Sequence, residues 1–118
     1  MPAAIALAVV ALIHVWAFVL ESILWTTPTG KRFFGLSTEL AEGSKALAMN
    51  QGLYNLFLAA GLVWGIVAPA AYRFDIRLFF LSCVIIAGVF GAITAKRSIL
   101  FVQGVPGLIA LALVIITR

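Results

Sequence analysis

The chain has 118 residues, of which 64% are hydrophobic and only 10% are charged, with a formal net charge of +4. A soluble domain of this length has too small a core to bury so much apolar side chain. The composition therefore excludes an ordinary globular fold and indicates an integral membrane protein. The positive charge does not predict a nucleic-acid partner. The eight Lys and Arg residues form short clusters between apolar runs, as topology signals and lipid-headgroup anchors do.

Four apolar runs have about the length needed to cross a membrane as helices: residues 3–25, 46–70, 78–95 and 99–117. At about 1.5 Å per residue each run covers roughly 27 to 37 Å, against a hydrocarbon core of about 30 Å. The runs are apolar at odd and even positions alike, which excludes the alternating pattern of a β-barrel. We therefore predict an all-α polytopic membrane protein, with residues 1–118 forming one antiparallel bundle of four transmembrane helices.

The connections between these runs differ in length. Residues 26–45 form the long one, which we expect either to cover one mouth of the bundle as a lid or to place Phe33 and Phe34 in the headgroup region. Ser37, Thr38 and the acidic residues that follow are typical of a helix start, so the second helix is expected to begin before the membrane. Residues 71–77 and 96–98 are predicted to be short turns.

Basic residues indicate an orientation. Five lie on the side of the first and third connections and three on the opposite side, which favours cytoplasmic loops 26–45 and 96–98. The margin is narrow, so a dual-topology homodimer stays open. The five are Lys31, Arg32, Lys45, Lys96 and Arg97, and the three are Arg73, Arg77 and Arg118.

Two ionisable residues, His14 and Glu21, lie inside the first apolar run. At about 100° per residue they share one stripe of the helix with Trp25. An ionisable side chain inside a membrane span is costly to keep, so this pair predicts a functional site.

Amide side chains are expected to meet this stripe from two other helices. Asn50, Gln51, Tyr54 and Asn55 form a polar face near the start of the second run, and Gln103 lies about one turn into the fourth. The first and third connections lie on the same side of the membrane, because two crossings separate them. These side chains and Glu21 all lie near those connections, so we expect them at the same depth in the bilayer. We predict a polar pocket there.

Roles within the predicted pocket follow from chemistry. Glu21 and His14 are the candidate catalytic residues, because both side chains can exchange protons. The candidate substrate-binding residues are Trp25, Asn50, Gln51, Tyr54, Asn55 and Gln103. No metal site and no cofactor is predicted, because His14 and Glu21 lie roughly 10 Å apart along the helix and no other His is present. The alternative to a functional pocket is a structural role, in which the amide side chains only form hydrogen bonds between helices.

Small residues and one proline shape the last two helices. Gly88 with Ala92, and Gly104 with Gly107, form small-residue faces that predict close helix packing. Pro106 removes a backbone hydrogen bond and is expected to kink the fourth helix beside Gln103.

The stretch from Asn50 to Asn55, with His14 and Glu21 before it and the residues from Gln103 to Pro106 after it, resembles a small bacterial membrane family of unknown function, domain of unknown function 1304. The resemblance covers nearly the whole chain. It implies a four-span protein of a bacterial inner membrane and brings no assigned activity.

Two looser likenesses concern residue types alone. The sterol isomerase and sigma-two receptor superfamily holds acidic, His, Asn and aromatic side chains around a lipophilic ligand. The small multidrug transporters share the length, four spans and a Glu in the first helix. Three hypotheses follow: a membrane site for a small lipophilic or amphiphilic molecule, with or without acid/base catalysis by Glu21; a proton-coupled exporter; or a non-catalytic structural membrane protein. Expected partners are membrane lipid, a lipophilic or cationic small molecule and a second copy of the chain.

Overall fold

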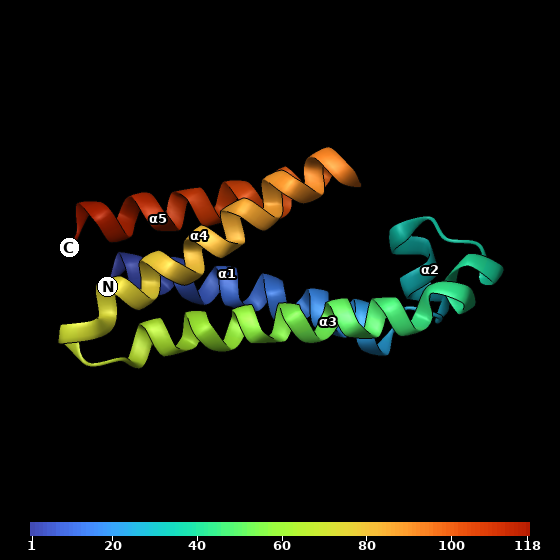
Figure 1. The fold of residues 1–118 in the computed structure, drawn as a ribbon, viewed down its shortest axis with the longest axis horizontal. Coiled ribbons are helices and arrows are strands. Elements are labelled where there is room, and N and C mark those ends of the chain that lie inside the picture. Colours follow the sequence, from blue (N-terminus) through green and yellow to red (C-terminus); the bar gives the residue numbers. More distant parts are fainter. The chain divides into compact units, whose positions relative to one another are not determined.

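The computed structural model describes residues 1–118, and all of its regular structure is helical (Figure 1). The all-α prediction is therefore confirmed. In chain order the elements are α1 (Pro2–Phe18), the π-helical turn η1 (Val19–Ile23), α2 (Pro28–Phe34), α3 (Thr38–Val67), α4 (Ala70–Thr94), the π-helical turn η2 (Leu100–Gly104) and α5 (Val105–Ile116).

Three helical segments are long and apolar enough to cross a membrane: Pro2–Ile23, Thr38–Val67 and Ala70–Thr94. These segments make the chain a candidate membrane protein. The remaining apolar helix, Leu100–Ile116, is shorter. At 1.5 Å per residue it reaches about 25 Å, somewhat less than a typical hydrocarbon core.

Prolines and caps place the helix ends differently from the apolar runs. The first helix ends at Ile23, because Thr27 caps the next helix and Pro28 holds Thr27 in an extended conformation, φ −78° and ψ 162°. The short turn predicted at residues 71–77 is wrong: α4 already begins at Ala70, directly after Pro69. The charged residues that indicated a loop instead form the first turns of a helix that extends past its apolar part.

The segment predicted as a long loop, residues 26–45, is mostly helical. Thr27 Oγ1 accepts a hydrogen bond from Gly30 N at 3.3 Å, and Gly35 ends α2 in the left-handed conformation with φ 66°. Ser37 Oγ accepts from Leu40 N at 3.1 Å and so caps α3, which confirms that this helix starts well before residue 46.

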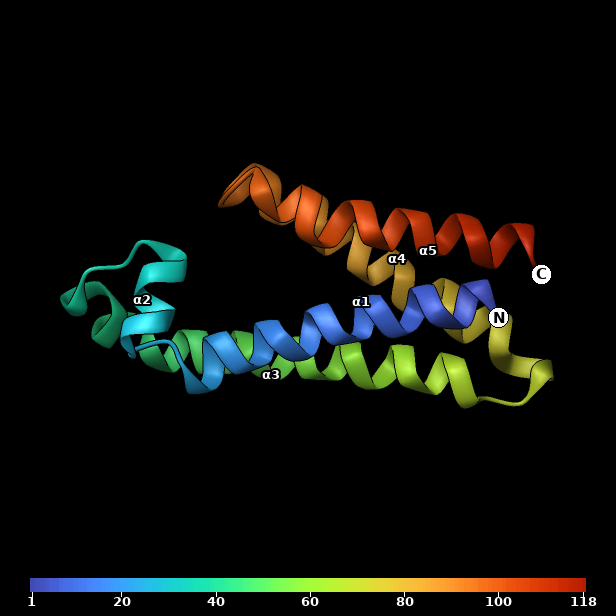
Figure 2. The same cartoon turned by 180° about the vertical axis from the view of Figure 1, so that it is seen from behind.

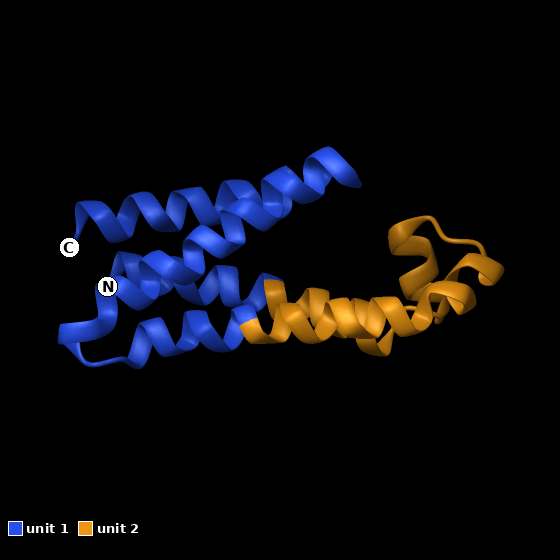
Figure 3. Cartoon of the chain, viewed as in Figure 1, with its two compact units in different colours: residues 1–13, 58–118 blue, residues 14–57 orange.

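The chain divides into two compact units, residues 1–13 with 58–118 (unit 1) and residues 14–57 (unit 2), coloured in Figure 3. Unit 1 holds the hydrophobic core. Its fully buried side chains include Leu7, Leu62, Leu81 and Val84.

Within unit 1, α4 and α5 lie side by side and antiparallel (Figures 1 and 2). A Cβ on Gly88 would lie 2.8 Å from Gly104 N and 2.9 Å from its Cα. A Cβ on Gly107 would lie 2.9 Å from Val84 Cγ1. The predicted small-residue packing is therefore confirmed at these positions, since no larger residue fits without displacing backbone or branched side chain.

Candidate functional site

Glu21 and Asn55 meet within unit 2. Asn55 Nδ2 donates a hydrogen bond to Glu21 Oε1 at 2.5 Å, across 34 positions of sequence. Both residues are half-buried, and Asn55 Nδ2 also reaches Gln51 O at 3.3 Å. The bond joins η1 to α3 through a carboxylate oxygen and an amide, two groups that are costly to leave unpaired away from water.

The backbones approach closely one turn away from this bond. Ser22 Oγ donates to Met49 O at 3.1 Å. A Cβ on Gly52 would overlap Ser22 Oγ and would lie 3.2 Å from Ser22 N. The sequence analysis did not identify Ser22 or the role of Gly52. The available signal was a glycine on the same face of the second helix as Asn55, since small residues mark close contacts between helices.

Glu21 lies in a π-helical turn. Leu24 N donates to Val19 O at 2.9 Å, a bond across five residues where an α-helix bonds across four. The turn therefore holds one extra residue, and the constant 100° spacing assumed for the stripe of His14, Glu21 and Trp25 does not hold past residue 18. π-helical turns within longer helices are rare and occur frequently at functional sites.

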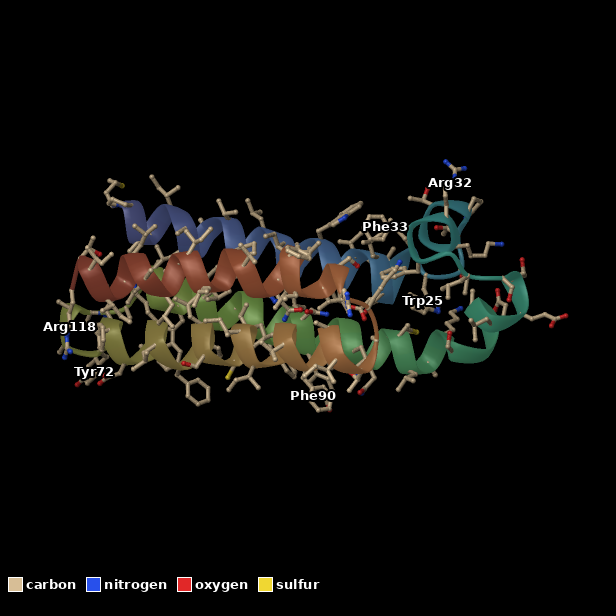
Figure 4. The ribbon with its side chains drawn as sticks, turned by 90° about the horizontal axis from the view of Figure 1, so that it is seen from above. Trp25, Arg32, Phe33, Tyr72, Phe90 and Arg118 are labelled. Atoms are coloured by element: carbon tan, nitrogen blue, oxygen red, sulfur yellow. The ribbon has the colours of Figure 1, made fainter.

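Trp25 lies just after η1, outside any helix. Its Nε1 donates to Ser44 Oγ at 3.0 Å, and its ring packs on Phe34 with centroids 4.8 Å apart. The side chain lies between the end of η1 and α2 (Figure 4). Trp25 therefore ties α2 to the first turns of α3, a contact that the apolar pattern did not predict.

His14 is a buried polar residue, with 1% of its side chain exposed. It lies on α1, about two turns before Glu21. The structure places it in unit 2 together with Glu21.

The side chains of Asn50, Gln51 and Tyr54 do not take part in the hydrogen bond between Glu21 and Asn55. All three are exposed, and Tyr54 has 53% of its surface open and packs on Phe57, with ring centroids 6.1 Å apart. The inward stripe of α3 instead follows Ala41, Ala48, Gly52 and Asn55, at spacings of seven, four and three residues. The small residues of that stripe, and not the polar ones, mark the face that is buried.

Gln103 lies in unit 1, on the second π-helical turn, and is half-buried. Val105 N donates to Leu100 O there, a bond across five residues. Val105 is also the first residue of α5, and Pro106 follows it. A π-helical turn therefore lies where the sequence predicted a kink caused by Pro106. Convergence of Gln103 with Glu21 stays a prediction.

These features define an all-helical candidate membrane protein with a carboxylate–amide contact at a π-helical turn. The chain belongs to the family of proteins of unknown function DUF1304, whose profile matches residues 8–115. It is similar to the uncharacterised protein YpaA of Lactococcus lactis subsp. lactis, with 32% identity over 107 residues, covering 89% of this chain and 87% of that protein. No solved structure matches the chain.

Proposed function

We propose that this protein spans a bacterial inner membrane and binds a small lipophilic or amphiphilic molecule at Glu21. The observation that carries the proposal is the hydrogen bond of Asn55 to Glu21 within an apolar helical segment, on a π-helical turn. Evolution rarely retains a carboxyl group at such a position without a function, because transferring it from water is costly.

The bond leaves part of the carboxyl group for a ligand. Asn55 binds one oxygen, Oε1. The other can accept a proton or a cationic or hydroxyl group, which fits a ligand with one polar end and an apolar body. In this proposal His14 assists as a second proton-exchanging group and Trp25 contacts the apolar body. The exposed residues Asn50, Gln51 and Tyr54 complete the site when ligand is bound.

The same proposal includes four antiparallel spans. Leu100–Ile116 is apolar, runs antiparallel to α4, and exposes large side chains such as Leu108, Ile109 and Ile116. A lipid environment would cover those side chains at no cost. With loops 26–45 and 96–98 in the cytoplasm, the five basic residues of that side obey the positive-inside tendency.

Binding of a lipophilic cation tests the proposal. Tetraphenylphosphonium is titrated onto the protein in lipid nanodiscs by equilibrium dialysis. We expect saturable binding that Glu21→Gln weakens by about tenfold, since a charged contact is lost while the acceptor for Asn55 is kept. Glu39→Gln is the matched control, because Glu39 is exposed at the start of α3. Equal binding by wild type and Glu21→Gln would contradict the proposal.

A proton-coupled exporter is the second candidate, because Glu21 is the acidic residue within the first apolar segment. Proteoliposomes with an imposed pH gradient separate the two functions. An exporter moves tetraphenylphosphonium against its gradient and loses this movement in Glu21→Gln. A binding protein or enzyme shows saturable binding without flux. A structural protein shows neither.

A further inference from the structure

A second polar site lies within unit 1 and shares no residue with the contact between Glu21 and Asn55. A cavity of about 360 Å³ opens between the first turns of α4 and the last turn of α5. Its polar lining comes from Arg73, Asp75, Arg77, Thr117 and Arg118. Arg118 and Tyr72 lie together at this end of the molecule (Figure 4).

The three arginines are held in place by contacts that leave their terminal nitrogens for a ligand. Arg77 Nε donates to Gly65 O at 2.7 Å, and Arg73 Nε donates to Ala68 O at 3.0 Å. The guanidinium of Arg118 stacks on Phe74, with its central carbon 3.9 Å from the ring centroid. Such anchoring lowers the entropy that each long side chain would lose on binding a ligand.

The side chains that line the cavity carry an excess of positive charge. Three guanidinium groups and one side-chain carboxylate, that of Asp75, lie in its wall, and none of the three forms an ion pair within 4.0 Å with a side-chain carboxylate. Like charges gathered in one partly enclosed space repel each other, and an anion relieves this repulsion. Guanidinium groups bind phosphate oxygens through paired N–H donors, so phosphate is the anion that this set of side chains fits.

The surroundings of the cavity indicate a lipid source for that phosphate. Three exposed side chains are close in sequence to residues that line the cavity: Val67, Tyr72 and Ile116, which are 71%, 64% and 77% exposed. An arginine cluster next to exposed apolar and tyrosine side chains, where apolar helices end, is the pattern of a headgroup-level site.

We propose that this cavity binds a phosphate group, carried by an anionic phospholipid, through Arg73, Arg77 and Arg118. The proposal does not depend on a function for Glu21. A general attraction of basic residues to membranes would involve all exposed basic residues alike. Binding in this cavity depends on its three arginines and is opposed by the carboxylate of Asp75.

Short-chain lipids test the proposal on the full chain in uncharged detergent, by microscale thermophoresis. The probes are dihexanoyl phosphatidylglycerol, dihexanoyl phosphatidylcholine and inorganic phosphate. We expect phosphatidylglycerol to bind about tenfold more tightly than phosphatidylcholine, since choline adds a cation beside the arginines. Binding of inorganic phosphate as tight as that of phosphatidylglycerol would support the phosphate site and assign it to a free phosphate. Failure of all three probes would overturn it.

Variants separate the cavity from general charge. Arg118→Gln should weaken phosphatidylglycerol binding by about tenfold, and its contact is only a stacking on Phe74, so the fold is not at risk. Asp75→Asn should tighten binding about threefold, because it removes the opposing charge. Arg97→Gln, an exposed arginine outside the cavity, is the control. Equal weakening by Arg97→Gln and Arg118→Gln, or no change in either cavity variant, would contradict the proposal.

Discussion

Gly52 lies directly against Ser22, so close that a methyl group on Gly52 would overlap the Ser22 hydroxyl oxygen. The contact sits one turn from the bond between Asn55 and Glu21. Absence of a side chain at position 52 is therefore what allows α3 and η1 to bring a carboxylate and an amide within hydrogen-bonding distance.

We expect Gly52→Ala to destabilise the protein by about 1–3 kcal/mol, the usual cost of forcing extra atoms into a packed contact. Chemical unfolding in mixed detergent micelles measures the change. Gly43→Ala is the matched control, because Gly43 lies in the same helix and a Cβ there meets nothing within 4 Å. That control should stabilise the helix by about 0.5–1 kcal/mol. Equal effects of the two substitutions would show that Gly52 is not in close contact.

The bond between Glu21 and Asn55 predicts a measurable coupling. Asn55→Leu should cost about 0.6 kcal/mol and at most about 1.7 kcal/mol, the average and the maximum found for hydrogen bonds between helices in a membrane. Glu21→Gln should cost less, because the amide oxygen still accepts from Asn55. Unfolding of Glu21→Leu, Asn55→Leu and the double variant gives a double-mutant cycle. Additive effects would mean that the two side chains do not interact.

The apolar pattern of the sequence predicts the helices well and their ends poorly. Hydrophobicity measures which residues prefer lipid, but a helix continues until a cap or a proline stops it. Hence α3 starts at Thr38, directly after its cap Ser37, and α4 starts at Ala70, directly after Pro69. Each start lies about two turns before the apolar run.

The candidate site was predictable in part. The possible partners of Glu21 could be narrowed to the amides of two other helices, Asn50, Gln51, Asn55 and Gln103, since a carboxyl group in an apolar segment needs a donor. Which amide faces it could not be read from polarity, because Asn50 and Gln51 point outward while Asn55 follows the small residues Ala48 and Gly52. The π-helical turn at Glu21 has no sequence signature at all.

Trp25 makes a contact whose loss should be local. Trp25→Phe keeps the ring against Phe34 and removes the Nε1 donor to Ser44. We expect a loss of about 1 kcal/mol, the net value of a typical hydrogen bond, and faster amide exchange in α2, since Trp25 ties this short helix down. Hydrogen exchange followed by mass spectrometry reads the α2 peptide. Trp16→Phe, at a position that is 48% exposed, should leave that peptide unchanged. Faster exchange in both variants would contradict the assigned role.

Gly88 should tolerate substitution poorly, because its nearest neighbours are backbone atoms. A Cβ there would meet Gly104 N at 2.8 Å and Gly104 Cα at 2.9 Å, and backbone atoms cannot rotate away as a side chain does. Gly88→Ala must therefore separate α4 from η2, with an expected loss of about 1–3 kcal/mol, and Gly88→Val should lose more. Gly91→Ala is the comparison, because its nearest neighbour is Ile99 Cγ2 at 3.0 Å, a side-chain atom that can move. Unfolding measurements on the three variants rank them. If Gly91→Ala were the most destabilised, the close backbone contact between Gly88 and Gly104 would not be what holds these helices together.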